Sequence, residues 1–256
     1  EKEDSLVRTH RNIHYNLARL KSVKEDIEEY LLKDSGLGGS FLGSMNLHNL
    51  EKNIIYTSSI LGNNLCVGSG YAFGNKVKDI SGVTFIVTGD GAIEEGAFYE
   101  SLLFLCSNKL PSIIIVENKE WSLGTKINER RGSIDLKNLS DSLGASYFLL
   151  KGNDPFDYLN QLKSYREIAF NQSIPVLVEV ELTTLGHWIL QNEENPNGKF
   201  INYHAGPAPN VNLTGDYPIL DESSNDPLFV LKDYMDIEEL LKISEDEMLT
   251  IKEEFK

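Results

Sequence analysis

Short apolar runs, separated by segments with helical spacing, constrain the fold of this chain more than any other feature. Four of them, GVTFIV, SIIIVE, SYFLL and PVLVEVEL, occupy residues 82–87, 112–117, 146–150 and 175–182. A short, continuous apolar run is typical of a strand buried on both faces of a parallel sheet. Residues 94–107 and 158–170 lie between these runs and have helical spacing. This alternation predicts right-handed βαβ crossovers, and hence an α/β fold with a parallel sheet flanked by helices.

The segments before the first run fit the same domain. The opening stretch through Leu32 has apolar residues at helical spacing, and the glycine cluster SGLGGS at residues 35–40 ends it as a loop. Residues 60–73 contain several small residues, which suit a buried helix that approaches its neighbours closely. We therefore predict a single domain over residues 1–256.

The chain is acidic, and its tail is especially so. It has 39 Asp and Glu residues against 24 Lys and Arg, a net charge of −15. From Asp221 onwards, residues 226–235 and 237–243 have amphipathic helical patterns, so we expect residues 221–256 to form an acidic helical C-terminal cap. The negative charge would repel a phosphate backbone and anionic lipid, and we therefore expect no nucleic acid or membrane partner.

The cysteines and the apolar runs indicate the cellular compartment in which the protein works. Cys66 and Cys106 have no CxxC spacing, which fits buried thiols in a reducing compartment. The apolar runs are far too short to span a membrane. The sequence predicts a cytoplasmic protein, although a chain that opens at Glu1 without methionine could have lost a leader or been trimmed.

Polar residues follow three of the predicted strands. Asp90 comes after the first run, Asn118 after the second and His187 after the fourth. The carboxyl ends of parallel strands gather at one edge of the sheet, where open α/β sheets bind ligands. A carboxylate and an amide oxygen suit Mg²⁺, while Gly89 and Gly91 would let the backbone approach an anion. The sequence therefore predicts a magnesium and diphosphate site at this edge.

The GDG tripeptide at residues 89–91 has simpler interpretations when it is taken alone. It is a common turn, and Asp90 could cap the helix that follows. Its spacing from Asn118, one helix and one strand later, favours the ligand site. GDGAIEEG departs from the dinucleotide-binding fingerprint because its third glycine comes too late, and the chain has no Gly-Lys-Ser/Thr triplet. A nicotinamide or ATP enzyme therefore has no support.

Several segments, in order, resemble one family. GDG with a following EG, then a helix, LP, an apolar strand and an asparagine, resembles the thiamine diphosphate signature. THRNIHYNLA at 9–18, GLGGSFLGSMNL at 36–47, GH at 186–187 and NDPLFVLKDYM at 225–235 resemble further segments of the same family. Together they cover nearly all of the chain. They resemble the alpha subunit of the decarboxylating component of 2-oxo acid dehydrogenases, including the acetoin dehydrogenase branch, and imply a thiamine diphosphate-binding fold.

The resemblance implies a role for each matching residue. Asp90 would bind Mg²⁺, Gly91 would lie against the diphosphate and Arg11 would hold a diphosphate oxygen. Leu61 would line the aminopyrimidine pocket, and His187 would act on substrate or phosphate. The complete set implied for cofactor binding is Arg11, Leu61, Gly89, Asp90, Gly91, Ala92, Asn118 and Lys119. By residue type alone, Arg11 could be a surface charge, Leu61 core and His187 an ordinary loop imidazole.

The chain departs from the family at the predicted metal site. The family's asparagine pair falls on Asn118 and Lys119, and in the family the second asparagine binds the metal. An ammonium group cannot bind Mg²⁺, but it could supply positive charge beside a diphosphate. We therefore expect metal dependence to be weakened, or Asn118 to act as the metal ligand together with Asp90.

Two of the family's histidines are also missing. Asn46 stands where the family has a histidine, and a histidine expected near Ile13 is absent. His10 and His14 stand close by, so we take His10, with His187, as a candidate catalytic residue. The substrate could therefore differ from the pyruvate type, or activity could be lost.

The resemblance also implies partners. In the family, the glutamate that activates the aminopyrimidine comes from a pyrimidine-binding domain, for which the motifs leave no length in this chain. We expect a beta subunit to supply it, in a complex of two alpha and two beta chains with thiamine diphosphate at the interface. A dihydrolipoyl acyltransferase would accept the acyl group in an oxidative system. Trp121 is expected to pack internally or to contact a partner.

Three functions stay open at this point. The first is an alpha subunit that cleaves a 2-oxo acid or acetoin and passes on the acyl group. The second is a subunit of a non-oxidative, transketolase-like carboligase that also uses thiamine diphosphate. The third is a degenerate homologue that acts as a partner-binding module, which the lysine at position 119 and the asparagine at position 46 would favour.

Overall fold

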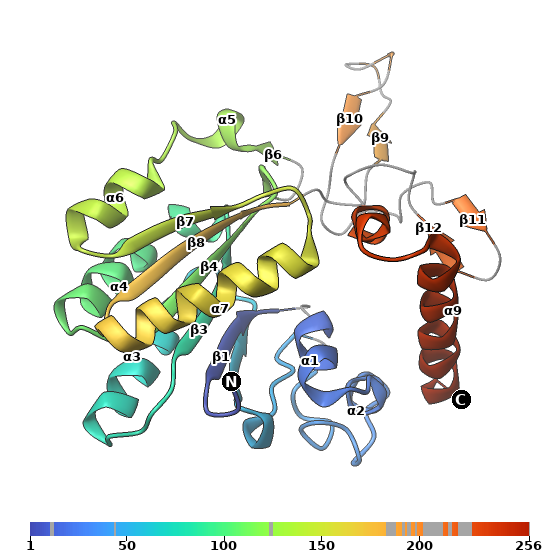
Figure 1. The fold of residues 1–256 in the computed structure, drawn as a ribbon, viewed down its shortest axis with the longest axis horizontal. Helices are drawn as coiled ribbons and strands as arrows, with labels where there is room; N and C mark the ends of the chain where they lie inside the picture. Colours follow the sequence, from blue (N-terminus) through green and yellow to red (C-terminus); the bar gives the residue numbers. More distant parts are fainter. Residues whose placement is uncertain are drawn as a thin grey trace.

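A six-stranded parallel sheet forms the centre of the protein (Figure 1). The computed structural model describes residues 1–10, 13–43, 45–122, 125–182, 188–190, 193, 196–197, 199–201, 212–214, 217–219 and 227–255. The strands lie in the order β2-β1-β3-β4-β8-β7, and all five neighbouring pairs are parallel. Their bounds are β1 Ser5–Thr9, β2 Ile54–Ser58, β3 Thr84–Gly89, β4 Ser112–Asn118, β7 Ser146–Leu150 and β8 Pro175–Glu181. The predicted α/β fold with a parallel sheet is confirmed.

The four predicted strands are β3, β4, β7 and β8, and β4 shows why their signal is strong. Its side chains alternate between the two faces of the sheet. Ile114 and Val116 pack into the core on one face, and Ile113 and Ile115 pack into the core on the other. Because both faces are covered, every position of the run favours an apolar residue.

Strand β1 shows where the sequence pattern was insufficient. Residues 5–9 read SLVRT, and both Ser5 and Arg8 are buried. A run that buries polar side chains lacks the continuous apolar signal, so this strand was not predicted. The helical spacing predicted through Leu32 is right for α1 (Ile13–Leu20) and α2 (Lys24–Tyr30), which follow β1.

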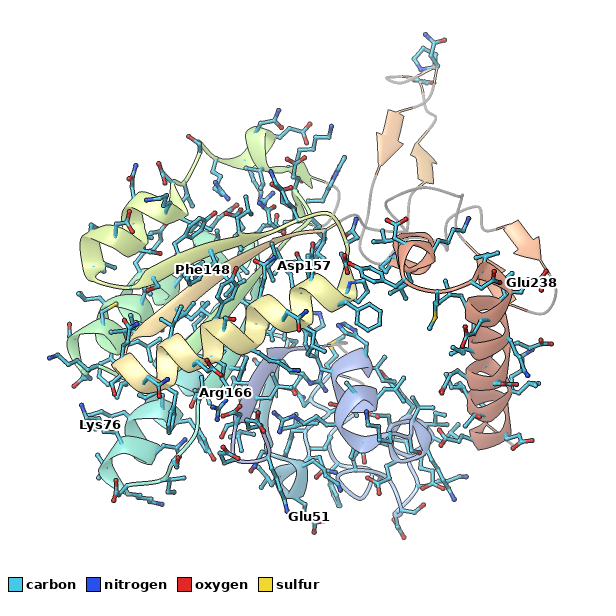
Figure 2. The ribbon with its side chains drawn as sticks, in the orientation of Figure 1. Glu51, Lys76, Phe148, Asp157, Arg166 and Glu238 are labelled. Carbon is cyan, nitrogen blue, oxygen red and sulfur yellow. The ribbon has the colours of Figure 1, made fainter. Side chains whose placement is uncertain are left out.

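Helices cover both faces of the sheet (Figure 1). On one face, α3, α4 and α6 bury apolar side chains around Phe98 and Leu102. On the other, α7 and α1 pack against the sheet, and Phe148 of β7 stacks on Tyr165 of α7 with ring centroids 3.9 Å apart (Figure 2). The bounds are α3 Asn63–Val77, α4 Gly96–Ser107, α6 Leu136–Leu143 and α7 Pro155–Gln172, with the short elements η1 Leu50–Lys52, η2 Ala92–Glu94, β5 Trp121–Ser122, β6 Thr125–Lys126 and α5 Ile127–Arg130.

The described parts of the chain beyond β8 form two short hairpins and a helical tail. Within the described residues, the tail contacts the sheet domain through Tyr234, which packs on Phe156 and donates a hydrogen bond to Asp154, the N-cap of α7. Glu254 of the tail also accepts a 2.8 Å hydrogen bond from the Val23 N–H. The helical prediction for the tail is confirmed, while its role as a cap of a single domain stays a prediction. The elements are β9 Trp188–Leu190, β10 Lys199–Ile201, β11 Asn212–Thr214, β12 Tyr217–Ile219, α8 Pro227–Val230, η3 Leu231–Asp233 and α9 Ile237–Glu254. Across the described ranges, none of the helices is both long and apolar enough to traverse a bilayer.

Both cysteines are free thiols, but they differ in exposure. Cys66 is exposed on α3, and Cys106 is half-buried on α4. The prediction that both are buried is therefore wrong for Cys66, because α3 turns this position away from the sheet. Burial raises the pKa of the Cys106 thiol to about 11, so this thiol stays protonated at neutral pH.

Helix α3 depends on a glycine where it crosses β3. A Cβ atom added at Gly68 would lie 2.6 Å from Cδ1 and Cγ1 of Ile86, whereas a Cβ at Gly70 would meet no atom within 4 Å. We expect Gly68→Ala to lower the free energy of unfolding, because overpacking costs about 1–3 kcal/mol and outweighs a gain of ~1 kcal/mol in helix propensity. Gly70→Ala, the matched control, should raise it by about 0.5–1 kcal/mol. Urea unfolding followed by circular dichroism measures both, and equal stability of the two variants would contradict the close packing.

Candidate functional site

A crevice opens between β1 and β3 at the carboxyl edge of the sheet. Helix α1 follows β1 onto one face, while α4 follows β3 onto the opposite face. Such a switch point is where open α/β sheets bind ligands. A cavity of about 280 Å³ lies here, lined by residues at or just after the carboxyl ends of β1, β2, β3, β4 and β8.

Six of the predicted site residues line this cavity. They come from the loops after four different strands, as expected from the rule that strand ends gather at one edge. Leu61 is 56% exposed, which excludes the alternative that it is core. The six are His10, Leu61, Gly89, Gly91, Ala92 and Lys119. Arg11 and His187, two further predicted site residues, lie outside the described residues.

The hairpin of β5 and β6 closes one wall of the cavity. Its residues Trp121 and Ser122 line the cavity together with Thr9, Glu117 and Leu182. A Cβ atom added at Gly91 would lie 2.8 Å from Ser122 Oγ and 3.1 Å from Ser122 Cβ, so glycine lets the two segments approach. Trp121 is only 7% exposed and packs within the protein, which fits one of its two expected roles.

Asp90 lies beneath the cavity and is bound to two cations. Its side chain is 1% exposed, Arg130 Nη2 donates to Oδ2 at 2.7 Å, and Lys119 Nζ lies 3.9 Å from Oδ1. Burial raises the pKa of Asp90, although the charges of Lys119 and Arg130 favour its ionised form. The carboxylate predicted to bind a metal therefore forms ion pairs in this structure.

Arg130 was not among the predicted site residues. It ends α5, whose Glu129 accepts a 2.8 Å hydrogen bond from the Lys126 N–H and so fixes the start of the helix. Its Nε also lies 2.8 Å from Glu94 Oε1, and Arg131 Nε makes a hydrogen bond of the same length to that oxygen. A signal was present in the sequence, since two adjacent arginines are unusual in so acidic a chain.

Asn118, the second predicted metal ligand, faces away from the cavity lining. Its Nδ2 donates to Glu179 Oε1 at 2.7 Å, and its Oδ1 accepts the Glu120 N–H at 3.0 Å. Tyr147 donates to the other oxygen of Glu179 at 2.7 Å, which ties the amide to β8 and β7. Among the residues that the structure describes, no group of three or more His, Cys, Asp or Glu side chains could hold a metal ion.

Glu117 is a lining residue that the strand-end rule does not predict. Tyr15 of α1 donates a 2.8 Å hydrogen bond to its Oε1. Burial raises the pKa of Glu117, against the opposing effects of the Tyr15 hydrogen bond and the Lys119 charge. The cavity lining thus contains both the Glu117 carboxyl group and the Lys119 ammonium.

The glycine-rich segment at 36–47 wraps a carboxylate instead of lining the cavity. Glu29 Oε2 accepts the N–H groups of Gly38 and Ser40 at 2.9 and 3.0 Å, and Oε1 accepts that of Leu42 at 2.7 Å. The backbone donors outweigh the effect of burial and lower the pKa of Glu29. Asn46, at the position of the family's histidine, is exposed and absent from the lining of the cavity.

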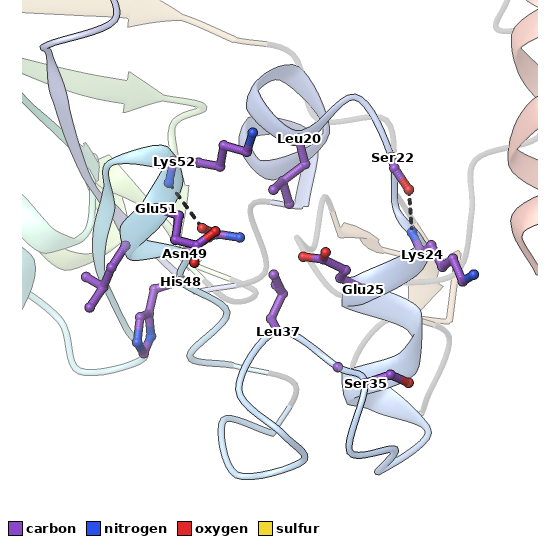
Figure 3. A pocket seen from close by; sticks show the side chains of 12 residues that line it. Leu20, Ser22, Lys24, Glu25, Ser35, Leu37, His48, Asn49, Glu51 and Lys52 are labelled. Carbon is purple, nitrogen blue, oxygen red and sulfur yellow. Dashed lines mark hydrogen bonds between the residues drawn. The ribbon is translucent and has the colours of Figure 1, made fainter.

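A second cavity, of about 620 Å³, lies beside the amino ends of β1 and β2 (Figure 3). It is bounded by the end of α1, the start of α2 and η1, with Leu20, Glu25, Leu37, His48 and Lys52 around it. Every lining residue is at least partly exposed. Since it lies at the edge opposite the predicted site residues and buries no polar group, we place the functional site at the carboxyl edge.

Sequence comparison identifies related proteins. The family described as Dehydrogenase E1 component matches residues 1–187. The pyruvate dehydrogenase E1 component subunit alpha of Rickettsia bellii is 28% identical over 181 residues, which cover 71% of this chain and 56% of that protein. The mitochondrial subunit of the same name from Dictyostelium discoideum is 32% identical over 124 residues, 48% of this chain and 32% of that protein. The match therefore covers little more than half of the Rickettsia bellii protein and about a third of the Dictyostelium discoideum one.

Solved structures agree on the fold. Transketolase from Campylobacter jejuni superposes with a TM-score of 0.54 at 16% sequence identity, over 70% of this chain and 29% of that one. Identity this low shows a shared fold alone. The superposition therefore supports the fold of the central sheet domain.

Proposed function

Because the chain belongs to the dehydrogenase E1 component family, we propose that it is the alpha subunit of a thiamine diphosphate-dependent enzyme that cleaves a 2-oxo acid and passes on the acyl group. The observation that carries this proposal is the cavity at the carboxyl edge, where six residues from the ends of four strands meet as the family resemblance implies. Acetoin as an alternative substrate and a cytoplasmic location belong to the same proposal.

The lining residues fit the cofactor. Gly89 and Gly91 expose backbone beside the cavity, Lys119 brings a positive charge for a diphosphate, and the exposed Leu61 offers an apolar contact for a ring. When bound, thiamine diphosphate supplies the electron sink that allows a carbon–carbon bond beside a carbonyl to break. Arg11 and His187 would complete the diphosphate and substrate contacts.

The chain's own residues would orient the reactants and manage protons. His10 lines the cavity, so its imidazole can hold a proton or donate a hydrogen bond to a bound substrate. Glu117 and Tyr15 form a hydrogen-bonded pair at the cavity wall, which keeps that wall rigid. The packed side chain of Trp121 excludes water from the same side.

We further propose that a beta subunit completes the site. A cavity of about 280 Å³ is smaller than the roughly 300–1,000 Å³ of pockets that enclose a whole ligand of moderate size. Leu61, exposed at the rim, would then lie at the boundary between the subunits. A dihydrolipoyl acyltransferase is the acceptor expected for an oxidative reaction.

Thiamine diphosphate binding tests the proposal. Titration into the chain co-expressed with its beta subunit should quench Trp121 fluorescence in a saturable way, because Trp121 lines the cavity. Gly91→Val should weaken binding by about tenfold or more, since the added side chain meets Ser122. Gly96→Ala, where a Cβ meets no atom within 4 Å, is the matched control and should bind normally.

Calorimetry provides the decisive control for that titration. The chain has two tryptophans, so the fluorescence response should be lost in Trp121→Phe while calorimetry measures its cofactor binding directly. Absence of binding by calorimetry in the assembled complex would overturn the catalytic proposal and leave the role of a partner-binding module.

A further inference from the structure

The predicted magnesium site does not fit the described residues. Magnesium requires near-octahedral oxygen ligands at about 2.1 Å. One oxygen of Asp90 accepts a hydrogen bond from Arg130 at 2.7 Å, whereas the other, Oδ1, is buried without a hydrogen-bond partner among the described residues and has the Lys119 ammonium 3.9 Å away. A divalent cation at that second oxygen would be repelled by Lys119, and the amide of Asn118 is held by Glu179.

One of the two cations lines the cavity in which a diphosphate would lie, and the other is bound to the same carboxylate. Lys119 lines the cavity and its side chain is 25% exposed, so the ammonium can reach an anion there. Arg130 lies behind it with 14% of its side chain exposed, fixed between Asp90 and Glu94. Two cations share the buried Asp90, and Arg130 and Arg131 share Glu94, so three cations face two carboxylates in this cluster.

The identity of the two cations suits phosphate oxygens. A lysine ammonium binds phosphate as a compact point charge, and charge-assisted hydrogen bonds to phosphate are about twice as strong as neutral ones. Arg130 is held in place by Asp90 and Glu94, whereas the more exposed Lys119 can donate hydrogen bonds to a phosphate in the cavity.

We infer that the Lys119 ammonium and the Arg130 guanidinium, held by Asp90, replace the divalent metal in neutralising the diphosphate of thiamine diphosphate. The inference rests on the proposed function and assigns to Asp90 the role of a positioning residue for the two cations. Arg131 reaches Glu94 and the Gly132 carbonyl but makes no ion pair with Asp90, so it has no part in the replacement.

The test compares binding with and without metal in the full chain assembled with its beta subunit. Thiamine diphosphate is titrated by calorimetry and by Trp121 fluorescence, once with excess EDTA and once with excess magnesium. The Kd values in the two buffers are expected to agree within about threefold. Binding only with magnesium would overturn the inference and leave the proposed function standing, whereas no binding in either buffer would overturn both.

Substitutions distinguish the specific roles of Lys119 and Arg130 from the effect of losing any nearby positive charge. Lys119→Asn should weaken binding in EDTA by about ten- to a hundredfold, and magnesium should restore it because the new amide oxygen can bind the metal. Arg130→Gln should also weaken binding in EDTA by about tenfold or more. Arg131→Gln, the matched control, should bind as the unchanged chain does. Equal losses for Arg130→Gln and Arg131→Gln would contradict the assigned role of Arg130.

Discussion

Replacing Glu29 by alanine is expected to lower the free energy of unfolding by about 2–4 kcal/mol, because a hydrogen bond to a charged group contributes about 1.5–3 kcal/mol and the three N–H groups that Glu29 accepts are partly buried. The buried Glu29 carboxylate accepts the backbone N–H groups of Gly38, Ser40 and Leu42, and the alanine variant leaves all three without this acceptor. Urea unfolding measures the loss. Glu25→Ala changes an exposed glutamate on the same helix and should stay within about 0.5 kcal/mol of the unchanged chain.

The same residue predicts a pH dependence. The folded-state pKa of Glu29 is lowered, because its backbone donors outweigh the opposing effect of burial. A lowered pKa means that the stabilisation is present above the unfolded-state pKa of about 4.3 and is lost as pH falls through the lower folded value. The stability difference between the unchanged chain and Glu29→Gln should therefore shrink towards acid pH. A difference that stays constant with pH would show that the charge of Glu29 does not hold the loop.

Replacing Arg8 by methionine is the second change with a large expected effect. Arg8 is wholly buried, with Nη2 donating to Asn16 Oδ1 at 2.7 Å and to the Leu47 carbonyl, and Nη1 donating to the Thr9 carbonyl at 3.2 Å. Asn16 in turn donates to Asp26 at 2.7 Å. Burial lowers the pKa of Arg8 to about 10, against the favourable charge of Asp26. Removing one member of a buried charged network costs about 3–5 kcal/mol, which chemical unfolding would detect.

Arg8 also links stability to the candidate site. Arg8 donates a hydrogen bond to the carbonyl of Thr9, the residue before His10, and both Thr9 and His10 line the cavity. We therefore expect Arg8→Met to weaken thiamine diphosphate binding even where the chain is folded. Arg8→Lys keeps the charge but loses the planar fork of donors, so its loss of stability should be smaller. Unfolding free energies that match for Arg8→Met and the unchanged chain would contradict a structural role for the network.

The strands that the sequence predicted and those that it missed differ in how they bury polar groups. Strands β3, β4 and β8 are covered on both faces by apolar clusters, so their runs are continuous. Strand β1 buries Arg8, and β2 buries Thr57, whose Oγ1 donates to the Leu47 carbonyl at 2.8 Å. These polar residues are satisfied by partners about ten to forty residues away, which a local pattern cannot reveal.

The candidate site divides in a similar way. The strand-end rule named Asp90, Asn118 and His187, of which Asp90 and Asn118 do not line the cavity and His187 lies outside the described residues. The family resemblance, which is confirmed by the match over residues 1–187, selected His10, Gly89 and Lys119, and these three line the cavity. The individual roles of these residues stay predictions. Arg130 was not predicted because it lies on α5, which does not directly follow a strand of the central sheet in the sequence. The orientation of Asn118 depends on Glu179 of β8, a pairing between strands that are far apart in sequence.

The order of the strands has a consequence for how the chain is made. Ser5 of β1 pairs with Thr84 of β3, and Ser112 of β4 pairs with Pro175 of β8. Contacts between such distant segments form late, because the intervening loop must close first. During synthesis, β1 has no β3 beside it and β4 has no β8 until much of the chain has left the ribosome. Nascent chains therefore carry exposed strand edges for a long period, and chaperone capacity and translation speed will govern the yield of folded protein as strongly as its final stability.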